Sequence, residues 1–194
     1  MLSQALDDKL KYFNEKKFEI SDNEVLLVEK ETQGKVHLKC KLDKETLVFH
    51  APADNVLAYL DEQKKYATAG PDKFLFQLDS SGKWILHIME FKKTINISTL
   101  KKSKIQFVMG IYNARAIAGF LNISISKIFL YSAYRSDSCS LIEMRSANIN
   151  ADDLKILRNW KNGKCVLVVD LEEKEFCHKK IPLDREGNGE CALS

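Results

Sequence analysis

Two acidic residues and one lysine have the types and spacing of a metal-assisted hydrolytic site. Asp72 follows Pro71, and Glu90 and Lys92 flank Phe91 eighteen residues after that aspartate. Two carboxylates held together repel each other, and a divalent cation such as Mg²⁺ removes this cost by accepting both as ligands. A neighbouring ammonium can orient or help deprotonate an attacking water and offset charge developing on a phosphate. These residue types therefore predict hydrolysis of phosphodiester bonds.

A β-hairpin is expected to bring these side chains together. Two apolar runs, residues 73–78 and 84–92, are joined by a polar loop that contains glycine, a pattern typical of a hairpin. With a turn centred midway, the numbers of paired residues sum to about 162, which places Asp72 opposite Glu90 on one face. Because side chains alternate along a strand, Lys92 shares that face. His87 falls on the other face, where we interpret it as structural.

The whole arrangement resembles the PD-(D/E)xK signature of restriction-endonuclease-like nucleases. This superfamily includes restriction enzymes, Holliday-junction resolvases and RecB-type nuclease domains. The resemblance covers residues 70–133, where a long helix and a further strand follow the hairpin, as the core of that superfamily requires. It implies that Asp72, Glu90 and the Phe91 carbonyl hold Mg²⁺ or Mn²⁺, and that Asp72, Glu90 and Lys92 are catalytic.

The Glu-x-Lys tripeptide alone has little specificity. It recurs at Glu15–Lys17 and at Glu172–Lys174, so its position at the end of a hairpin carries the prediction. The competing interpretation is a solvated hairpin end in which Glu90 and Lys92 form a surface ion pair.

Basic and polar residues after the hairpin are predicted to contact nucleic acid. Lysines at a helix N-terminus oppose the helix dipole, whereas neutralisation of phosphates drives nucleic-acid binding. A solvated helix face is the alternative for each lysine. The predicted contacts are Lys93, Lys101, Lys102, Lys104 and Gln106. Some RecB-type nucleases have Gln-x-x-x-Tyr on this helix, but here Tyr112 lies six residues beyond Gln106.

Many members of the superfamily add an acidic residue from the first helix of the core. The candidate is Glu15 if the N-terminal helix belongs to the core, or Glu62 if the helix before Gly70 does. The sequence leaves both open.

Hydrophobic periodicity predicts an α+β or mixed α/β domain with a restriction-endonuclease-like core, a central mixed sheet flanked by helices, and an N-terminal β-meander elaboration. We expect a single domain over 1–194: an N-terminal part at 1–66, the nuclease core at 70–133, and a C-terminal elaboration at 134–194. The predicted elements are helices at 2–15, 54–65, 98–121 and 152–160, meander strands at 24–30, 35–42 and 46–50, later strands at 127–133 and 165–171, and a frayed tail at 185–194.

Composition narrows the function classes only modestly. The 194 residues are 45% hydrophobic and 29% charged, with a formal net charge of +3, which by itself does not indicate a nucleic-acid binder. Five cysteines without a Cys-x-x-Cys pair favour reduced thiols over zinc or disulfides. No apolar run approaches the roughly 18 residues of a membrane span, and the opening residues do not resemble a signal peptide. We therefore expect a cytoplasmic protein without membrane contact.

Three functions remain in competition at this stage. The first is a metal-dependent nuclease acting on nucleic acid, with DNA favoured over RNA, as a monomer or a homodimer. The second is a noncatalytic module that binds nucleic acid or protein on a nuclease-like fold. The third is a small immunity or regulatory protein with a chance motif.

Overall fold

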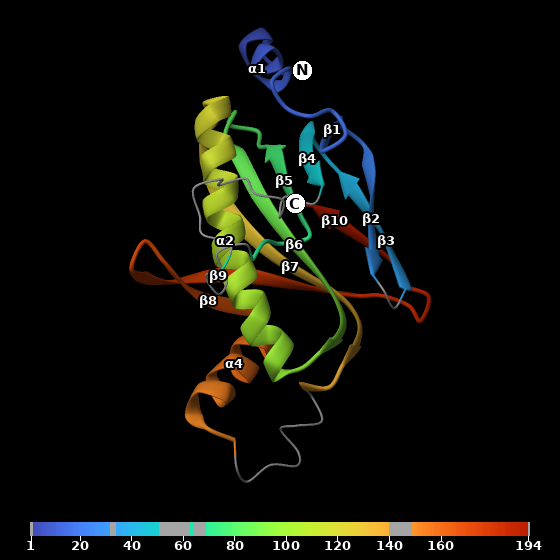
Figure 1. The fold of residues 1–194 in the computed structure, drawn as a ribbon, viewed down its shortest axis with the longest axis vertical. Coiled ribbons are helices and arrows are strands. Elements are labelled where there is room, and N and C mark those ends of the chain that lie inside the picture. The colour runs from blue at the N-terminus through green and yellow to red at the C-terminus, as the bar shows by residue number, and fades with distance from the viewer. Residues whose placement is uncertain (1, 32–33, 51–62, 64–68, 140–148, 194) are drawn as a thin grey trace.

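The computed structural model describes residues 2–31, 34–50, 63, 69–139 and 149–193. These residues form a mixed α+β structure, as expected (Figure 1). Its elements are α1 (Gln4–Leu10), β1 (Phe18–Ser21), β2 (Glu24–Glu31), β3 (Gly34–Leu42), β4 (Thr46–His50), β5 (Lys73–Leu78), β6 (Trp84–Ile95), α2 (Ile97–Leu121), β7 (Ile125–Asp137), α4 (Ala151–Lys161), β8 (Lys164–Val169), β9 (Glu172–Pro182) and β10 (Asn188–Leu193). Within the described ranges, no helix has the length and apolarity needed to cross a membrane.

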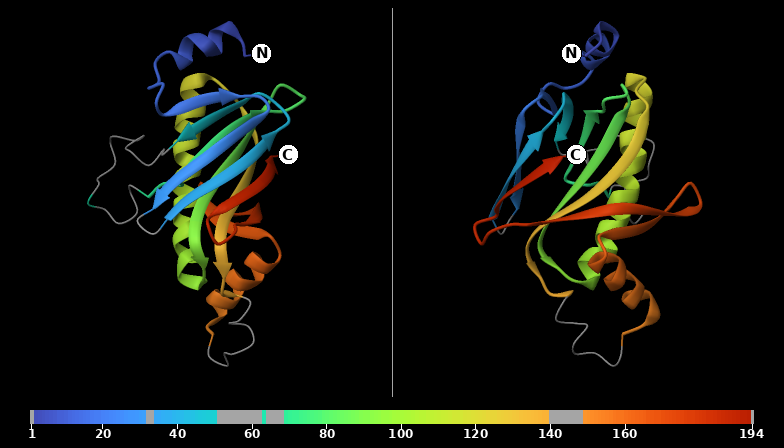
Figure 2. Two further views of the ribbon diagram at one scale, coloured as in Figure 1. Left: turned by 90° about the vertical axis from the view of Figure 1, so that its right-hand side faces the viewer. Right: turned by 180° about the vertical axis from the view of Figure 1, so that it is seen from behind.

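A seven-stranded mixed sheet forms the centre of the molecule. Its strand order is β1-β4-β5-β6-β7-β9-β8. The β6–β7 and β7–β9 pairs are parallel, and the other pairs are antiparallel. Helix α2 covers one face, and a second sheet of order β10-β3-β2 covers the other (Figure 2). The central strands are therefore buried on both sides.

This double coverage explains the continuous apolar runs of the hairpin strands. Phe74 and Ile88 point toward Phe107 of α2 in one core cluster. Leu75 points the other way, toward Leu38 of the three-stranded sheet. Alternate residues of each strand thus build different cores, and the α2 face is the one that receives Glu90.

Helix α2 begins and ends with strong local signals. The Asn96 side chain accepts a hydrogen bond from the Thr99 backbone N–H, and the Thr99 hydroxyl accepts one from the Asn96 N–H, which forms a capping box. The helix ends at Asn122, which adopts the left-handed conformation. Gly110 lies within the continuous helix. Its lack of a side chain allows α2 to pack closely against the segment before β5, since a Cβ atom there would lie 2.8 Å from Pro71 Cγ.

The predictions for the N-terminal part were partly wrong. The first helix is shorter than predicted and ends at Leu10. The β2–β3 pair is antiparallel, as expected, but β4 does not continue the meander. It lies between β1 and β5 in the main sheet, because four of its five residues are buried and suit a strand covered on both faces. The predicted helix at 54–65 lies outside the described residues.

The predicted frayed tail was also wrong. Strand β10 pairs in parallel with β3, and its Leu193 is fully buried. Two intervening strands, β8 and β9, extend the main sheet beside β7, and β9 was not predicted. The 165–171 run ends at Val169 because Asp170 and Leu171 form the turn, both with positive φ.

Candidate active site

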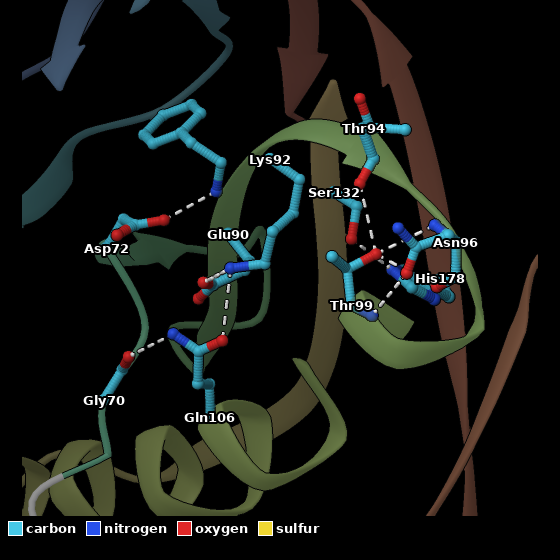
Figure 3. Close-up of polar contacts among 11 residues, drawn as sticks. Gly70, Asp72, Glu90, Lys92, Thr94, Asn96, Thr99, Gln106, Ser132 and His178 are labelled. Carbon is cyan, nitrogen blue, oxygen red and sulfur yellow. Dashed lines mark hydrogen bonds and ion pairs between the residues drawn. The ribbon is translucent and has the colours of Figure 1, made fainter. Parts of the chain in front are cut away.

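The observed hairpin register agrees with the register expected from the sequence. Lys73 pairs with Met89, and Leu78 pairs with Trp84, so the sum of 162 holds along the ladder. Asp72 immediately precedes β5 and faces the middle of β6, where its Oδ2 accepts a hydrogen bond of 2.6 Å from the Phe91 backbone N–H (Figure 3). The aspartate is thereby fixed beside Glu90.

Lys92 joins this pair through two contacts. Its Nζ donates to Glu90 Oε1 and, at 3.2 Å, to Gln106 Oε1. The Gln106 Nε2 donates to the Gly70 carbonyl at 3.1 Å. Figure 3 shows Gln106 reaching from α2 to both the lysine and the segment before Asp72. Through Gln106, helix α2 therefore fixes both the Lys92 side chain and the backbone at Gly70, two residues before Asp72.

The Glu90 carboxylate is buried, which contradicts a solvated hairpin end. Only 1% of its side chain and 13% of the Lys92 side chain are exposed. Its Oε2 atom has no hydrogen-bond partner among the residues that the structure describes. Leaving a buried acceptor unpaired costs about 1–3 kcal/mol, and more for a charged group. Such an atom requires a ligand or a proton.

Electrostatics at the site disfavour two ionised carboxylates. Burial raises the pKa of Glu90 to about 8, the negative charge of Asp72 adds to the shift, and Lys92 opposes it. Burial likewise raises the pKa of Asp72, whereas the Phe91 N–H and Lys92 oppose that shift. Both carboxylates are costly to ionise in this environment. A divalent cation would reverse that cost.

The donor set fits a hard divalent ion. Carboxylate oxygens with a backbone carbonyl and water suit Mg²⁺ or Mn²⁺, and the unpaired Glu90 Oε2 provides an available ligand atom. Across the described ranges, no cluster of three or more His, Cys, Asp or Glu side chains is placed to hold a metal. A metal ion held here would therefore depend on two carboxylates, with the Phe91 carbonyl as the predicted further donor.

The predicted nucleic-acid contacts lie in different places. Gln106 is in the site, but Lys101 forms an ion pair with Asp153 of α4 at 2.6 Å. Lys104 lines a pocket with Trp160 on the flank of α2 away from Gln106, because two residues correspond to about 200° of helix rotation. Lys101 and Lys104 thus lie on the side of α2 that faces α4. The other two, Lys93 and Lys102, are exposed.

Of the two candidates for the extra acidic residue, only Glu15 lies among the described residues. Glu15 lies beyond the end of α1 and is exposed, and Glu62 lies outside the described residues. Instead, Glu29 of β2 forms a 2.7 Å ion pair with Lys73, whose side chain is 3% exposed. The Glu29 charge contributes to the raised pKa of Asp72. A lysine inside an apolar strand was the available signal, because a buried ammonium needs an acidic partner.

His87 lies in the core on the face of the sheet opposite Glu90, as expected from the alternation along the strand. Its ring contacts the Tyr131 hydroxyl at 2.8 Å and Gln77 at 3.2 Å. Burial lowers the pKa of His87 to about 3, which keeps the ring neutral. All five cysteines are free thiols, and Cys40, Cys139 and Cys165 are buried.

Tight packing of α2 against Pro71 gives a first testable prediction. Replacing Gly110 by alanine should lower the free energy of unfolding by about 1–3 kcal/mol through overpacking, because the added Cβ would meet the rigid Pro71 ring and Ile88. Gly119→Ala is the matched control, since no atom lies within 4 Å of its Cβ position. This control should stabilise the protein by about 0.5–1 kcal/mol. Urea unfolding measures both, and equal effects would refute the close approach.

Comparison with known proteins finds no matching family model, no matching curated protein and no matching solved structure. Any functional assignment therefore depends on the geometry of the site itself.

Proposed function

We propose that this chain is a metal-dependent nuclease that hydrolyses phosphodiester bonds, with Asp72, Glu90 and Lys92 as its catalytic residues. The observation that carries the proposal is the pairing of partly exposed Asp72 with buried Glu90 beside Lys92, where Glu90 Oε2 has no partner among the described residues. One lysine balances only one of the two carboxylate charges, so repulsion between the carboxylates remains unless a cation or a proton removes it.

The connectivity around the site supports a restriction-endonuclease-like core. The β5–β6 hairpin carries the residues, α2 crosses over, and β7 returns parallel to β6. A long helix followed by a further strand in the same sheet is what the resemblance of residues 70–133 implied. Fold resemblance alone does not establish activity, so the side chains carry the functional part of the proposal.

Each residue has a defined chemical task in this proposal. Asp72 and Glu90 would hold Mg²⁺ or Mn²⁺, which when bound supplies Lewis-acid polarisation of the phosphoryl group and a more acidic water. Lys92 orients the attacking water and offsets negative charge on the phosphate in the transition state. Gln106 keeps the lysine side chain directed toward Glu90 through its 3.2 Å contact.

Nucleic acid is the substrate class that this chemistry serves, and DNA is favoured because it is the commoner substrate in the superfamily. Lys93 and Lys102 are exposed, and they are the proposed phosphate contacts. A noncatalytic binding module is the second candidate. The retained carboxylate pair disfavours it, since binding phosphates requires no buried acidic cluster.

A cleavage assay with matched variants tests the proposal. Purified protein is incubated with supercoiled plasmid, single-stranded DNA and RNA in Mg²⁺, Mn²⁺ or EDTA. The test variants are Glu90→Gln and Lys92→Met. The controls, Glu172→Gln and Lys174→Met, alter a second Glu-x-Lys sequence whose glutamate is 74% exposed and whose lysine is 37% exposed.

We expect cleavage in Mg²⁺ or Mn²⁺ that EDTA abolishes, that both test variants lose and that both controls retain. Equal cleavage by all variants would identify a contaminating nuclease and contradict the proposal. Salt-sensitive binding of nucleic acid without any cleavage would favour the binding module.

A further inference from the structure

Two thiols from opposite ends of the chain lie in contact on the far side of the main sheet. Cys40 of β3 and Cys191 of β10 are directly paired in the parallel ladder. Their Sγ atoms are 3.3 Å apart, within hydrogen-bonding distance for sulfur. The two residues are separated by 151 positions in the sequence.

The backbone geometry at this position suits a disulfide bond. Adjacent strands lie about 4.8 Å apart, within the usual range of Cα separations for bonded cysteines. Directly paired residues have their side chains on one face, and here that face is the core between the two sheets. Forming the bond would require the sulfur atoms to approach by little more than 1 Å.

The two thiols differ in their environments. Cys40 is fully buried, whereas Cys191 is partly exposed. The hydrogen bond with Cys40 lowers the pKa of Cys191, and the positive charge of Lys179 adds to that effect. The bond to Cys191 and burial both raise the pKa of Cys40. Cys191 is therefore the thiol expected to react first with an oxidant, and Cys40 is the thiol expected to resolve the resulting mixed disulfide.

We propose that Cys40 and Cys191 form a reversible dithiol–disulfide site that reacts with small-molecule disulfides such as oxidised glutathione. The Cys191 thiolate attacks one glutathione sulfur, breaks the S–S bond and releases one glutathione thiolate. The Cys40 thiolate then attacks Cys191 Sγ and displaces the second glutathione. Overall, two protein thiols are oxidised to one disulfide, one glutathione disulfide is reduced to two thiols, and the two protons lost by the protein thiols are taken up by the two glutathione thiolates.

The bond would fasten the C-terminal strand to β3. Strand β10 otherwise depends on its ladder with β3 and on buried Leu193. A covalent link across such a long loop restricts the unfolded chain strongly, so oxidation should raise the melting temperature by about 5–15 °C. The proposed nuclease site lies on the other face of the main sheet, so this inference does not depend on the proposed function.

The test uses the full-length chain with Cys177→Ser, which removes an exposed thiol that would otherwise form mixed disulfides. Folded protein is treated with oxidised glutathione and analysed by non-reducing peptide mapping and thermal unfolding, before and after dithiothreitol. Cys191→Ser in the same background is the comparison variant, and Cys139→Ser is the matched control at a buried cysteine elsewhere.

We expect a peptide containing Cys40 linked to one containing Cys191, a higher melting temperature, and reversal of both by dithiothreitol. Cys191→Ser should lose both effects, and Cys139→Ser should retain both. A stable glutathione adduct on Cys191 without the internal bond would overturn the proposal. Linkage that appears only in urea would overturn it too, and linkage without a higher melting temperature would refute the fastening of β10.

Discussion

Replacing Lys92 by methionine is expected to reduce metal-dependent cleavage by about 10²–10⁴-fold, the usual contribution of a positioned proton-transfer or charge-stabilising side chain. The same change should lower the free energy of unfolding by about 2–4 kcal/mol at pH 9, because it leaves the Glu90 carboxylate buried without its ammonium. The loss should be smaller at pH 6, where Glu90 can take up a proton instead. Urea titrations at the two pH values and initial cleavage rates measure these effects.

Lys174→Met is the control for this prediction. Lys174 lies in the other Glu-x-Lys sequence and pairs with Asp170 and Glu172, but its side chain is 37% exposed. Removing such a pair should change the free energy of unfolding by less than about 1 kcal/mol. Equal effects of the two substitutions on stability would contradict the buried environment assigned to Lys92.

The second large effect is on the pH dependence of stability. The pKa of Glu90 is about 8 in the folded protein and has a reference value of 4.5. Between these values the folded chain holds a proton on Glu90 that the unfolded chain has released. The free energy of unfolding should therefore fall as pH rises from about 4.5 to 8, by up to about 1.4 kcal/mol per pH unit, and level off above 8.

Glu90→Gln isolates this contribution because glutamine does not titrate. Other groups, including Asp72 with its own raised pKa, still titrate in the variant, so the informative quantity is the difference between the two curves. In EDTA, the wild-type protein should lose stability relative to Glu90→Gln across pH 5–8. Parallel curves would show that Glu90 has an ordinary pKa and is not held as the structure places it.

The local part of the site could be predicted from the sequence. A five-residue polar loop between two apolar runs sets the hairpin register, and the register places Asp72 opposite Glu90. Alternation along β6 then places Lys92 beside Glu90. Gln106 was also predicted from the sequence and lies in the site. Its partners, Lys92 and Gly70, became evident only in the structure.

Long-range pairing could not be predicted in the same way. The parallel β3–β10 ladder joins residues about 150 positions apart, and no turn connects them to indicate a register. Strand β4 has the apolar pattern of a meander strand, yet it joins the main sheet because both of its faces become buried. Glu29 was missed for the same reason, since its contact with Lys73 depends on how the two sheets pack.

Binding of a divalent metal by the Asp72–Glu90 pair is the claim on which the proposed function depends. Isothermal titration calorimetry of the purified chain with Mn²⁺ at pH 8 tests it without any assumption about substrate. We expect saturable binding by the wild-type protein and by the exposed-motif control Glu172→Gln, with binding lost in Glu90→Gln. Absence of binding by the wild-type protein, or equal binding by Glu90→Gln, would contradict the assignment.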